Sequence, residues 1–151
     1  METEAAFDDA EFLGLARSGK RDAHRLALFA RHFETGERAR AVVPVPGGTL
    51  IVTDRRVMEL APHLEVDGAW NVREFQGYSV ARELPIASIS SAKRRIGSSS
   101  DGGGTTNAVE EVLDLETSRG TESFLLSRGP RPVLTEAESA RLTDALLNQA
   151  K

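Results

Sequence analysis

Cysteine is absent from the 151 residues of the sequence, and histidine occurs only three times. The absence of cysteine excludes disulfides, thiol nucleophiles and thiolate metal sites. His24 and His32 are two turns apart on a predicted helix, and His63 lies in a different segment. A helical zinc site needs histidines one turn apart. We therefore predict no metal site and no cofactor.

Long apolar runs and strongly basic segments are missing too. Apolar stretches such as 41–43 and 50–52 are far too short to cross a bilayer. The first residues, Met1-Glu2-Thr3-Glu4, are acidic where a signal peptide would be basic. The formal net charge is −4, so the chain lacks the concentrated positive surface that nucleic acid requires. These absences predict a cytoplasmic protein that does not bind nucleic acid.

The motifs of common enzyme classes do not occur. No G-x-S-x-G elbow presents a serine nucleophile. The glycines at 102–104 are not followed by the lysine that a phosphate-binding loop requires. Glu110 and Glu111 are adjacent, so on a strand they point to opposite faces and cannot act as a catalytic pair. We predict that the protein is not an enzyme.

Helical patterns and phenylalanines are concentrated at the start of the chain. Hydrophobic residues make up 40% and charged residues 28% of the sequence, as in one globular domain. An acidic start at Asp8 and Asp9 precedes an apolar stripe, and a second helix is predicted over 21–33. So short a helical pair buries too little surface to fold alone. We predict that residues 1–36 form a helical cap on a β domain at 37–151.

Short segments after Arg38 alternate apolar and polar residues and are separated by turns, which is typical of antiparallel strands. The predicted strands span 40–45, 49–53, 56–61, 71–83, 89–96, 109–117 and 121–127. Residues 62–70 are predicted to form a loop, and 97–107 a mobile hairpin tip. Thr135 and Glu138 form a capping box that begins a C-terminal helix. Together these elements predict an α+β fold, either a small barrel or a sandwich, closed by that helix.

The corner after the strand at 49–53 combines two residues that stabilise turns with two arginines. Thr53 and Asp54 can accept hydrogen bonds from nearby backbone amides. Arg55 and Arg56 follow, and charged residues beside a turn are commonly solvated or paired with acidic side chains. We expect these residues to shape the turn and not to form a binding site.

Three segments resemble the pleckstrin-homology-like (PH-like) superfamily, in particular GRAM and bacterial PH-like domains. Residues 48–58, GTLIVTDRRVM, are similar to the L-x-L-T-x-x-R-L hairpin of that family. Residues 84–92, LPIASISSA, look like its I-P-L-x-x-I-x-x-V segment, and 113–126 resemble its last hairpin. The resemblance covers about 38–149. It implies a seven-stranded antiparallel PH-like partly open barrel capped by a C-terminal α-helix, to which this chain adds an N-terminal helical segment and a long glycine-rich loop.

Lys93, Arg94 and Arg95 form the densest basic run, and Arg73 and Arg82 can approach it across the sheet. The resemblance implies that a basic patch at the open end of such a barrel binds anionic headgroups. On a strand, however, Lys93 and Arg95 share one face while Arg94 points to the other. Charges on an edge strand also discourage aggregation. Both an anion-binding role and a protective role therefore stay open.

Aromatic residues provide the candidates for partner binding: Phe7, Phe12, Phe29, Phe33 and Trp70. Exposed aromatic side chains often carry binding energy, although core or half-buried packing is the more common role for a residue such as Trp70. Apolar side chains beyond one helical stripe also need cover. We therefore expect the helical segment to contact a protein partner or a second copy of the chain.

The leading functional hypothesis is a non-catalytic binding or scaffolding module that mediates protein–protein interaction, including self-association. The alternative is a peripheral membrane domain that binds anionic phospholipid through the basic run. A third hypothesis is a sensor that holds a small molecule inside the barrel.

Overall fold

The structure, a computed structural model, describes residues 5–14, 23–67, 72–100 and 107–147. Its helices and strands follow one another in a simple order along the chain. They are β1 (Glu11–Phe12), α2 (Ala23–Ala30), β2 (Ala39–Val45), β3 (Gly48–Thr53), β4 (Arg56–Asp67), β5 (Val72–Pro85), the short 3-10 helix η2 (Ile86–Ser88), β6 (Ile89–Ser100), β7 (Asn107–Thr117), β8 (Gly120–Gly129) and α3 (Glu136–Leu147).

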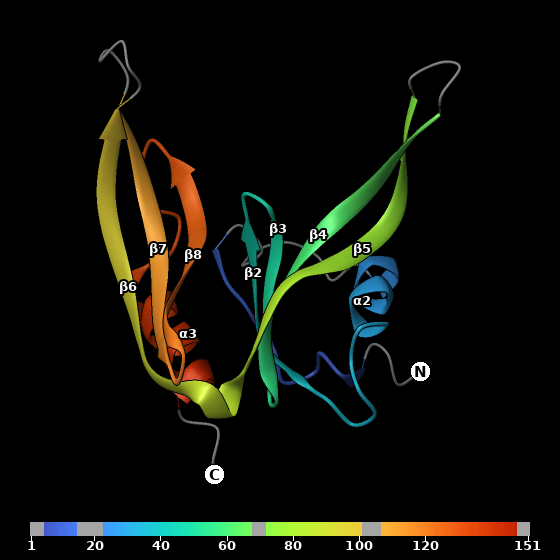
Figure 1. Cartoon of the computed structure of the whole chain (residues 1–151), viewed down its shortest axis with the longest axis horizontal. Coiled ribbons are helices and arrows are strands. Elements are labelled where there is room, and N and C mark those ends of the chain that lie inside the picture. The colour runs from blue at the N-terminus through green and yellow to red at the C-terminus, as the bar shows by residue number, and fades with distance from the viewer. Residues whose placement is uncertain (1–4, 15–22, 68–71, 101–106, 148–151) are drawn as a thin grey trace.

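The strands form two sheets that face each other (Figure 1). The five-stranded sheet has the order β1-β2-β3-β4-β5, and the three-stranded sheet has the order β6-β7-β8. Neighbouring strands are antiparallel except β1 and β2, which are parallel. The predicted α+β class is confirmed. The two sheets do not join into a closed barrel, and the described residues form eight strands where the sequence predicted seven.

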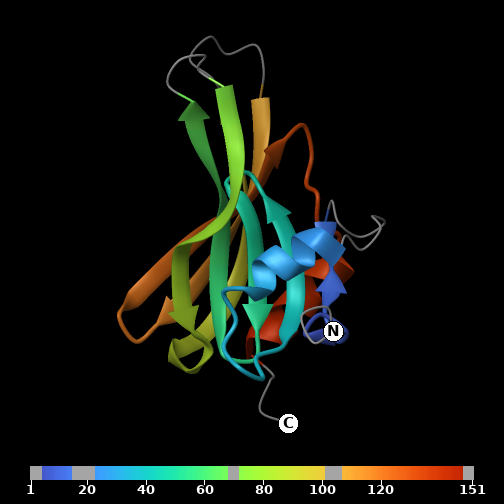
Figure 2. The ribbon, with the colours of Figure 1, turned by 90° about the vertical axis from the view of Figure 1, so that its right-hand side faces the viewer.

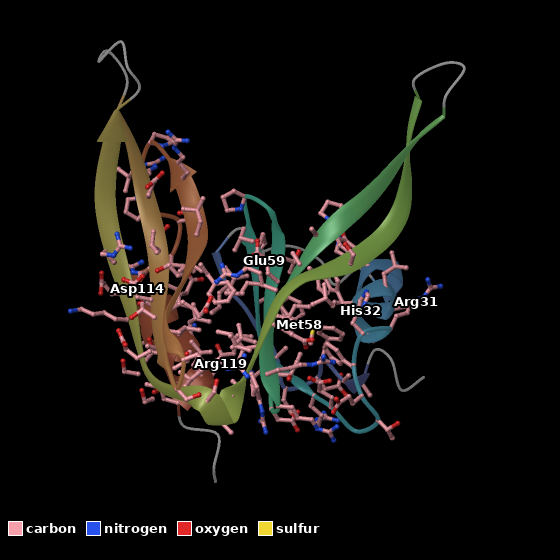
Figure 3. All side chains as sticks on the ribbon, viewed as in Figure 1. Arg31, His32, Met58, Glu59, Asp114 and Arg119 are labelled. Atoms are coloured by element: carbon pink, nitrogen blue, oxygen red, sulfur yellow. The ribbon has the colours of Figure 1, made fainter. Side chains whose placement is uncertain are left out.

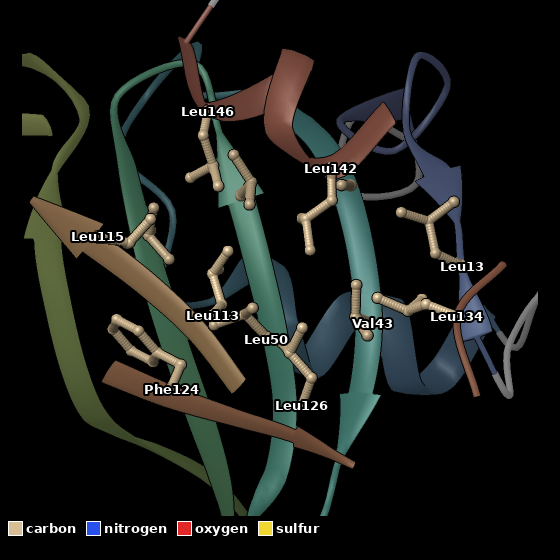
Figure 4. Close-up of a cluster of buried hydrophobic side chains, with 13 residues drawn as sticks. Leu13, Val43, Leu50, Leu113, Leu115, Phe124, Leu126, Leu134, Leu142 and Leu146 are labelled. Carbon is tan, nitrogen blue, oxygen red and sulfur yellow. The ribbon is translucent and has the colours of Figure 1, made fainter. Parts of the chain in front are cut away.

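A main hydrophobic core fills the space between the two sheets and α3 (Figure 4). Its buried members come from both sheets and from the helix: Val43, Leu50, Leu113, Leu115, Phe124, Leu126, Leu142 and Leu146. Alternation along β7 and β8 turns Leu113, Leu115 and Phe124 inward, as the sequence predicts. Each such leucine contributes about 1.5–3 kcal/mol when it leaves water. The helix α3 therefore holds the two sheets together by sharing their core.

A second hydrophobic core covers the opposite face of the five-stranded sheet. The helix α2 lies across this face (Figure 2). Phe7, from the N-terminal segment, packs into the same core. Phe7 and Phe29 are fully buried against strand residues that include Ile51 and Met58. The rings of Phe7 and Phe33 lie 5.4 Å apart between centroids. The five-stranded sheet is thus packed on both faces by its own chain.

The first predicted helix is wrong for residues 8–12. Asp8 and Asp9 lie in a turn, and Glu11–Phe12 form β1. The chain is extended here because it pairs with β2, and the Leu13 amide donates to the Val42 carbonyl at 3.0 Å. A tertiary pairing of this kind overrides local helix propensity. Residues 15–22 lie outside the described residues.

The two long hairpins extend further than predicted. Residues 62–67, predicted as a loop, continue β4, and Pro62 pairs with Tyr78. Proline supplies no N–H to the ladder, and the register shifts beside it, opposite Gly77 with its φ of 93°. The predicted mobile tip is strand at both ends, because β6 reaches Ser100 and β7 begins at Asn107. Residues 101–106 lie outside the described residues.

The predicted capping box is confirmed at the start of α3. The Glu138 amide donates to Thr135 Oγ1, and the Thr135 amide donates to Glu138 Oε1, each at 3.0 Å. Glu138 also accepts a hydrogen bond from the Gly14 amide at 3.4 Å. Arg141 forms an ion pair with Glu11 at 3.5 Å. The first strand and the last helix are therefore joined directly.

Candidate functional site

Arg94, the middle residue of the predicted basic run, points into the protein. Its guanidinium lies 2.8 Å from Glu111 Oε1 and 2.9 Å from Glu136 Oε2, and it donates to the Leu134 carbonyl at 3.0 Å. The side chain of Arg94 is only 8% exposed, and that of Glu111 is fully buried. The charge of Arg94 is therefore neutralised inside the protein and is not exposed to an anionic ligand.

Arg82 lies on β5, in the other sheet, and is also engaged. It donates to the Ser123 carbonyl of β8 at 2.7 Å and forms an ion pair with Glu122 at 2.8 Å. Its guanidinium carbon sits 3.9 Å from the centroid of the Phe124 ring, a cation–π contact. Arg82 thus joins β5 to β8 beside the main core and does not extend the basic run. Arg73 pairs with Val66 in the β4–β5 register.

Lys93 and Arg95 are exposed on one face of β6, as alternation predicts. Asp114 on β7 is the cross-strand partner of Lys93, and it binds Arg95 at 2.9 Å. Ser123 Oγ donates to the same carboxylate at 2.6 Å. The hydrogen bonds from Arg95 and Ser123 hold the pKa of Asp114 below its ordinary value. A carboxylate therefore lies between the two exposed cations.

These two cations belong to what we call the outer face, the side of the three-stranded sheet that is turned away from the five-stranded sheet. Its central members are Lys93, Arg95, Val112, Asp114, Ser123 and Leu125, and Ser91, Glu116 and Thr121 continue it toward the β7–β8 turn. Leu125 is 39% exposed and lies opposite the partly buried Val112. Asp114 marks this face in Figure 3. Among the described residues, no helix or strand packs on it (Figure 1).

The phenylalanines predicted to bind a partner instead pack within the chain. Phe7 is 0% and Phe29 is 1% exposed. Phe12 and Phe33 are partly buried against the same second core. Their partner is the five-stranded sheet, which corrects the expectation that Phe7 and Phe29 present a surface to another molecule. Trp70 lies outside the described residues.

Two buried carboxylates were not identified from the sequence as structural centres. Glu111 accepts hydrogen bonds from Ser127 Oγ and from the backbone amides of Val133 and Leu134, in addition to its pair with Arg94. It thereby fixes the segment that leads into α3. The sequence did indicate that Glu111 is buried, because alternation places it on the same face of its strand as Leu113 and Leu115.

Glu37 is the second buried carboxylate. It binds Arg56 at 3.0 Å and accepts from Thr53 Oγ1 at 2.5 Å. Burial acts to raise the pKa of Glu37, but the hydrogen bonds from Arg56 and Thr53 outweigh it, so this pKa lies below its ordinary value. The bond to Glu37 is in turn the main cause that raises the pKa of Arg56. The expectation that this corner shapes the turn agrees with these contacts.

A cavity of about 410 Å³ lies beside this corner. Its lining combines the N-terminal segment with the loop after α2: Ala5, Ala6, Ala30, Phe33, Glu34, Thr35, Gly36, Glu37 and Arg38. The carboxylate of Glu37 is already satisfied by Arg56 and Thr53, and Arg38 pairs with Asp9 at 3.1 Å. The lining therefore offers no set of converging, unpaired charges for catalysis.

Within the described ranges, no three histidine, aspartate or glutamate side chains come close enough to hold a metal ion. In the same part of the chain, no helix has the length and apolar character needed to span a membrane. Searches of protein-family models, of curated proteins and of solved structures found no match for this chain.

Proposed function

We propose that the chain is a non-catalytic binding module, built on the PH-like frame that its sequence resembles, and that it contacts a protein partner through the outer face. One observation carries this proposal. The five-stranded sheet is packed on both faces, by α2 and by the main core, whereas the part of the chain that the structure describes packs the three-stranded sheet only on its inner face. A sheet face without intramolecular cover is available to another molecule.

The chemistry of the outer face supports a protein partner. Leu125 and Val112 form a small apolar centre, and Lys93, Arg95 and Asp114 surround it with charge. Protein interfaces combine an apolar centre with a polar rim in this way. The ion pairs of the rim are exposed, so they add little to folding stability and remain free to exchange partners.

Photo-cross-linking and reconstitution test the proposal. A photo-reactive residue at Leu125 should capture a partner that the same residue at Arg31, exposed on the opposite side of the molecule (Figure 3), does not capture. With the identified partner purified, Leu125→Asp should weaken the dissociation constant by about tenfold or more, because it places a charge in the apolar centre. Arg31→Asp should leave it unchanged. Equal effects of the two variants would remove the outer face as the site.

Anionic membrane binding is the competing function, because Lys93 and Arg95 are exposed on one face. It has weaker support, since Asp114 binds Arg95, Arg94 is neutralised inside the protein, and Arg82 is paired with Glu122 at the surface. Co-sedimentation with phosphatidylserine vesicles separates the two functions. We expect no binding. Salt-sensitive binding that is lost in a Lys93→Ala, Arg95→Ala variant would replace a protein partner with a membrane.

A further inference from the structure

Gly97 leaves a gap among the side chains of the outer face. It follows Lys93 and Arg95 at every second position of β6, so a side chain there would point outward. Glycine inside a strand weakens it and often marks a bulge, a bend or the close approach of a ligand or another backbone. The β6–β7 register runs without a shift from Ser91 to Ser100, and Gly97 does not have a positive φ. Apart from its two chain neighbours, no described atom lies within 4 Å of a Cβ atom placed at Gly97. Neither a bulge nor a close contact among the described residues therefore accounts for this glycine.

The two charged residues beside Gly97 hold their charges away from it. Glu110 is the cross-strand partner of Gly97 on β7, and its carboxylate binds Arg128 of β8, on the far side of β7, at 3.4 Å. Arg95 precedes Gly97 on the same face of β6. Its guanidinium binds Asp114, which lies on the side of Arg95 remote from Gly97, at 2.9 and 3.3 Å. Both ion pairs thus leave the main chain at Gly97 uncovered.

Three residues without charge cross the outer face diagonally between these ion pairs. They are Gly97 on β6, Val112 on β7 and Leu125 on β8, and we call them the apolar strip. Val112 and Leu125 are cross-strand partners, and Val112 is the diagonal neighbour of Gly97. Diagonal neighbours lie about 7–8 Å apart, a spacing that an aromatic side chain spans. A large planar ring laid along the strip would therefore contact all three strands without displacing a charge.

We propose that the outer face binds an aromatic anchor of its protein partner, a tryptophan or tyrosine side chain that lies over the apolar strip. This inference rests on the proposed function and names the residue type through which the partner binds. Tryptophan and tyrosine are enriched among the residues that carry most of the binding energy of an interface. An aromatic ring also covers the bare main chain of a glycine in a sheet. The ion pairs on either side of the strip supply the polar rim that surrounds such an anchor.

Nuclear magnetic resonance spectra of the full chain test the inference, with N-acetyl-L-tryptophanamide as the probe. An indole ring on the apolar strip should shift the methyl signals of Val112 and Leu125 and the amide signal of Gly97. These shifts should saturate as the probe concentration rises. The aliphatic control is N-acetyl-L-leucinamide, which has no ring to span the strip and should give no saturable shift.

A matched pair of valine variants locates the site. Gly97→Val fills the space over the main chain of β6 and should weaken the dissociation constant of the tryptophan probe by about tenfold or more. Gly129→Val is the control and should leave that constant unchanged. Gly129 also has no atom within 4 Å of an added Cβ, but it pairs with Val109 on the inner face of the sheet. Leu125→Ala adds no bulk and should weaken the same constant by about threefold or more.

Three results would each overturn the inference. They are the absence of saturable shifts with the tryptophan probe, equal binding of the leucine probe, and equal effects of Gly97→Val and Gly129→Val. If cross-linking at Leu125 still captures a partner, the proposed function survives such a result and only the aromatic anchor is lost. If cross-linking captures no partner either, both proposals fail.

Discussion

At the scale of single residues, a buried carboxylate joins the segment before α3 to the three-stranded sheet, which no strand pairing does. Glu111 binds Arg94 of β6, Ser127 of β8 and the amides that precede α3. A buried charge of this kind is costly to leave unpaired. The ion pair between Arg94 and Glu136 uses the same guanidinium but is open to solvent at the glutamate, which is 93% exposed. Two acidic partners of one arginine therefore differ sharply in their contribution to stability.

Replacing each partner of Arg94 measures this difference. Glu111→Ala should destabilise the protein by about 3–5 kcal/mol, because it leaves a buried guanidinium and two backbone amides without their acceptor. Glu136→Ala should cost about 1 kcal/mol or less, as for a solvent-exposed pair. Urea unfolding followed by circular dichroism gives both values. Similar losses in the two variants would contradict the role assigned to Glu111.

Glu37 predicts a pH dependence of stability. Its folded pKa lies below its unfolded value, so its contribution is fully present above the unfolded pKa and is lost as the pH falls through the folded pKa. Glu37→Gln should therefore be less stable than the natural chain at pH 7. The difference should shrink steadily as the pH drops below about 4, because the protonated carboxyl resembles the amide. A constant difference in urea midpoint across this range would show that Glu37 is not ionised in the fold.

At the scale of elements, the hairpin of β2 and β3 depends on a close approach of two backbones. Gly48 has a φ of 151°, and a Cβ atom there would lie 2.0 Å from the Leu60 carbonyl oxygen of β4. No flexible side chain can move aside to accept it, because the obstacle is backbone. The hairpin therefore needs a glycine where the three strands meet.

A pair of alanine substitutions tests this requirement. Gly48→Ala should lower the unfolding free energy by several kcal/mol and reduce soluble yield, since β3 must shift relative to β4. Gly97→Ala, on β6, should change it by about 0.5 kcal/mol or less, because nothing lies within 4 Å of the added carbon. Thermal unfolding of both variants measures the two changes in stability. Tolerance of alanine at position 48 would contradict the backbone contact.

Element prediction succeeded where the sequence pattern and the tertiary structure agree. The capping box of Thr135 and Glu138 and the inward leucines of β7 follow from local chemistry, and both are present. The helix predicted from Asp8 failed because β1 is created by a parallel pairing with β2, which lies about 30 residues later. Pro62 was taken as a break in β4, but the register shift beside it accommodates the missing N–H.

The candidate site was less predictable than the fold. The opposite orientations of Arg94 and Lys93 follow from alternation, and the structure places them so. That β6 is a sheet edge, that Asp114 separates the exposed cations, and that the phenylalanines face their own sheet all depend on which strands become neighbours. The spacing of residue types along the chain does not show which distant segments become neighbours in the fold.

At the scale of the whole molecule, the second core removes the main reason to expect self-association. The phenylalanine-rich segment already covers the five-stranded sheet. We expect a monomer of 16.3 kDa over a wide range of protein concentration. Size-exclusion chromatography with light scattering measures this mass directly. A stable dimer would show that the covering segment is exchanged between chains or that another surface self-associates.

The contact between Gly14 and Glu138 has a consequence for synthesis. It joins residues 124 positions apart, and the ion pair of Glu11 and Arg141 reinforces it. The ribosome must therefore synthesise α3 before Glu11 and Gly14 can form these contacts. Until then the segment at 5–14 is held by its pairing with β2 and by the second core, and contacts of such long range form late in folding. Loss of α3 through early termination would consequently loosen both ends of the molecule.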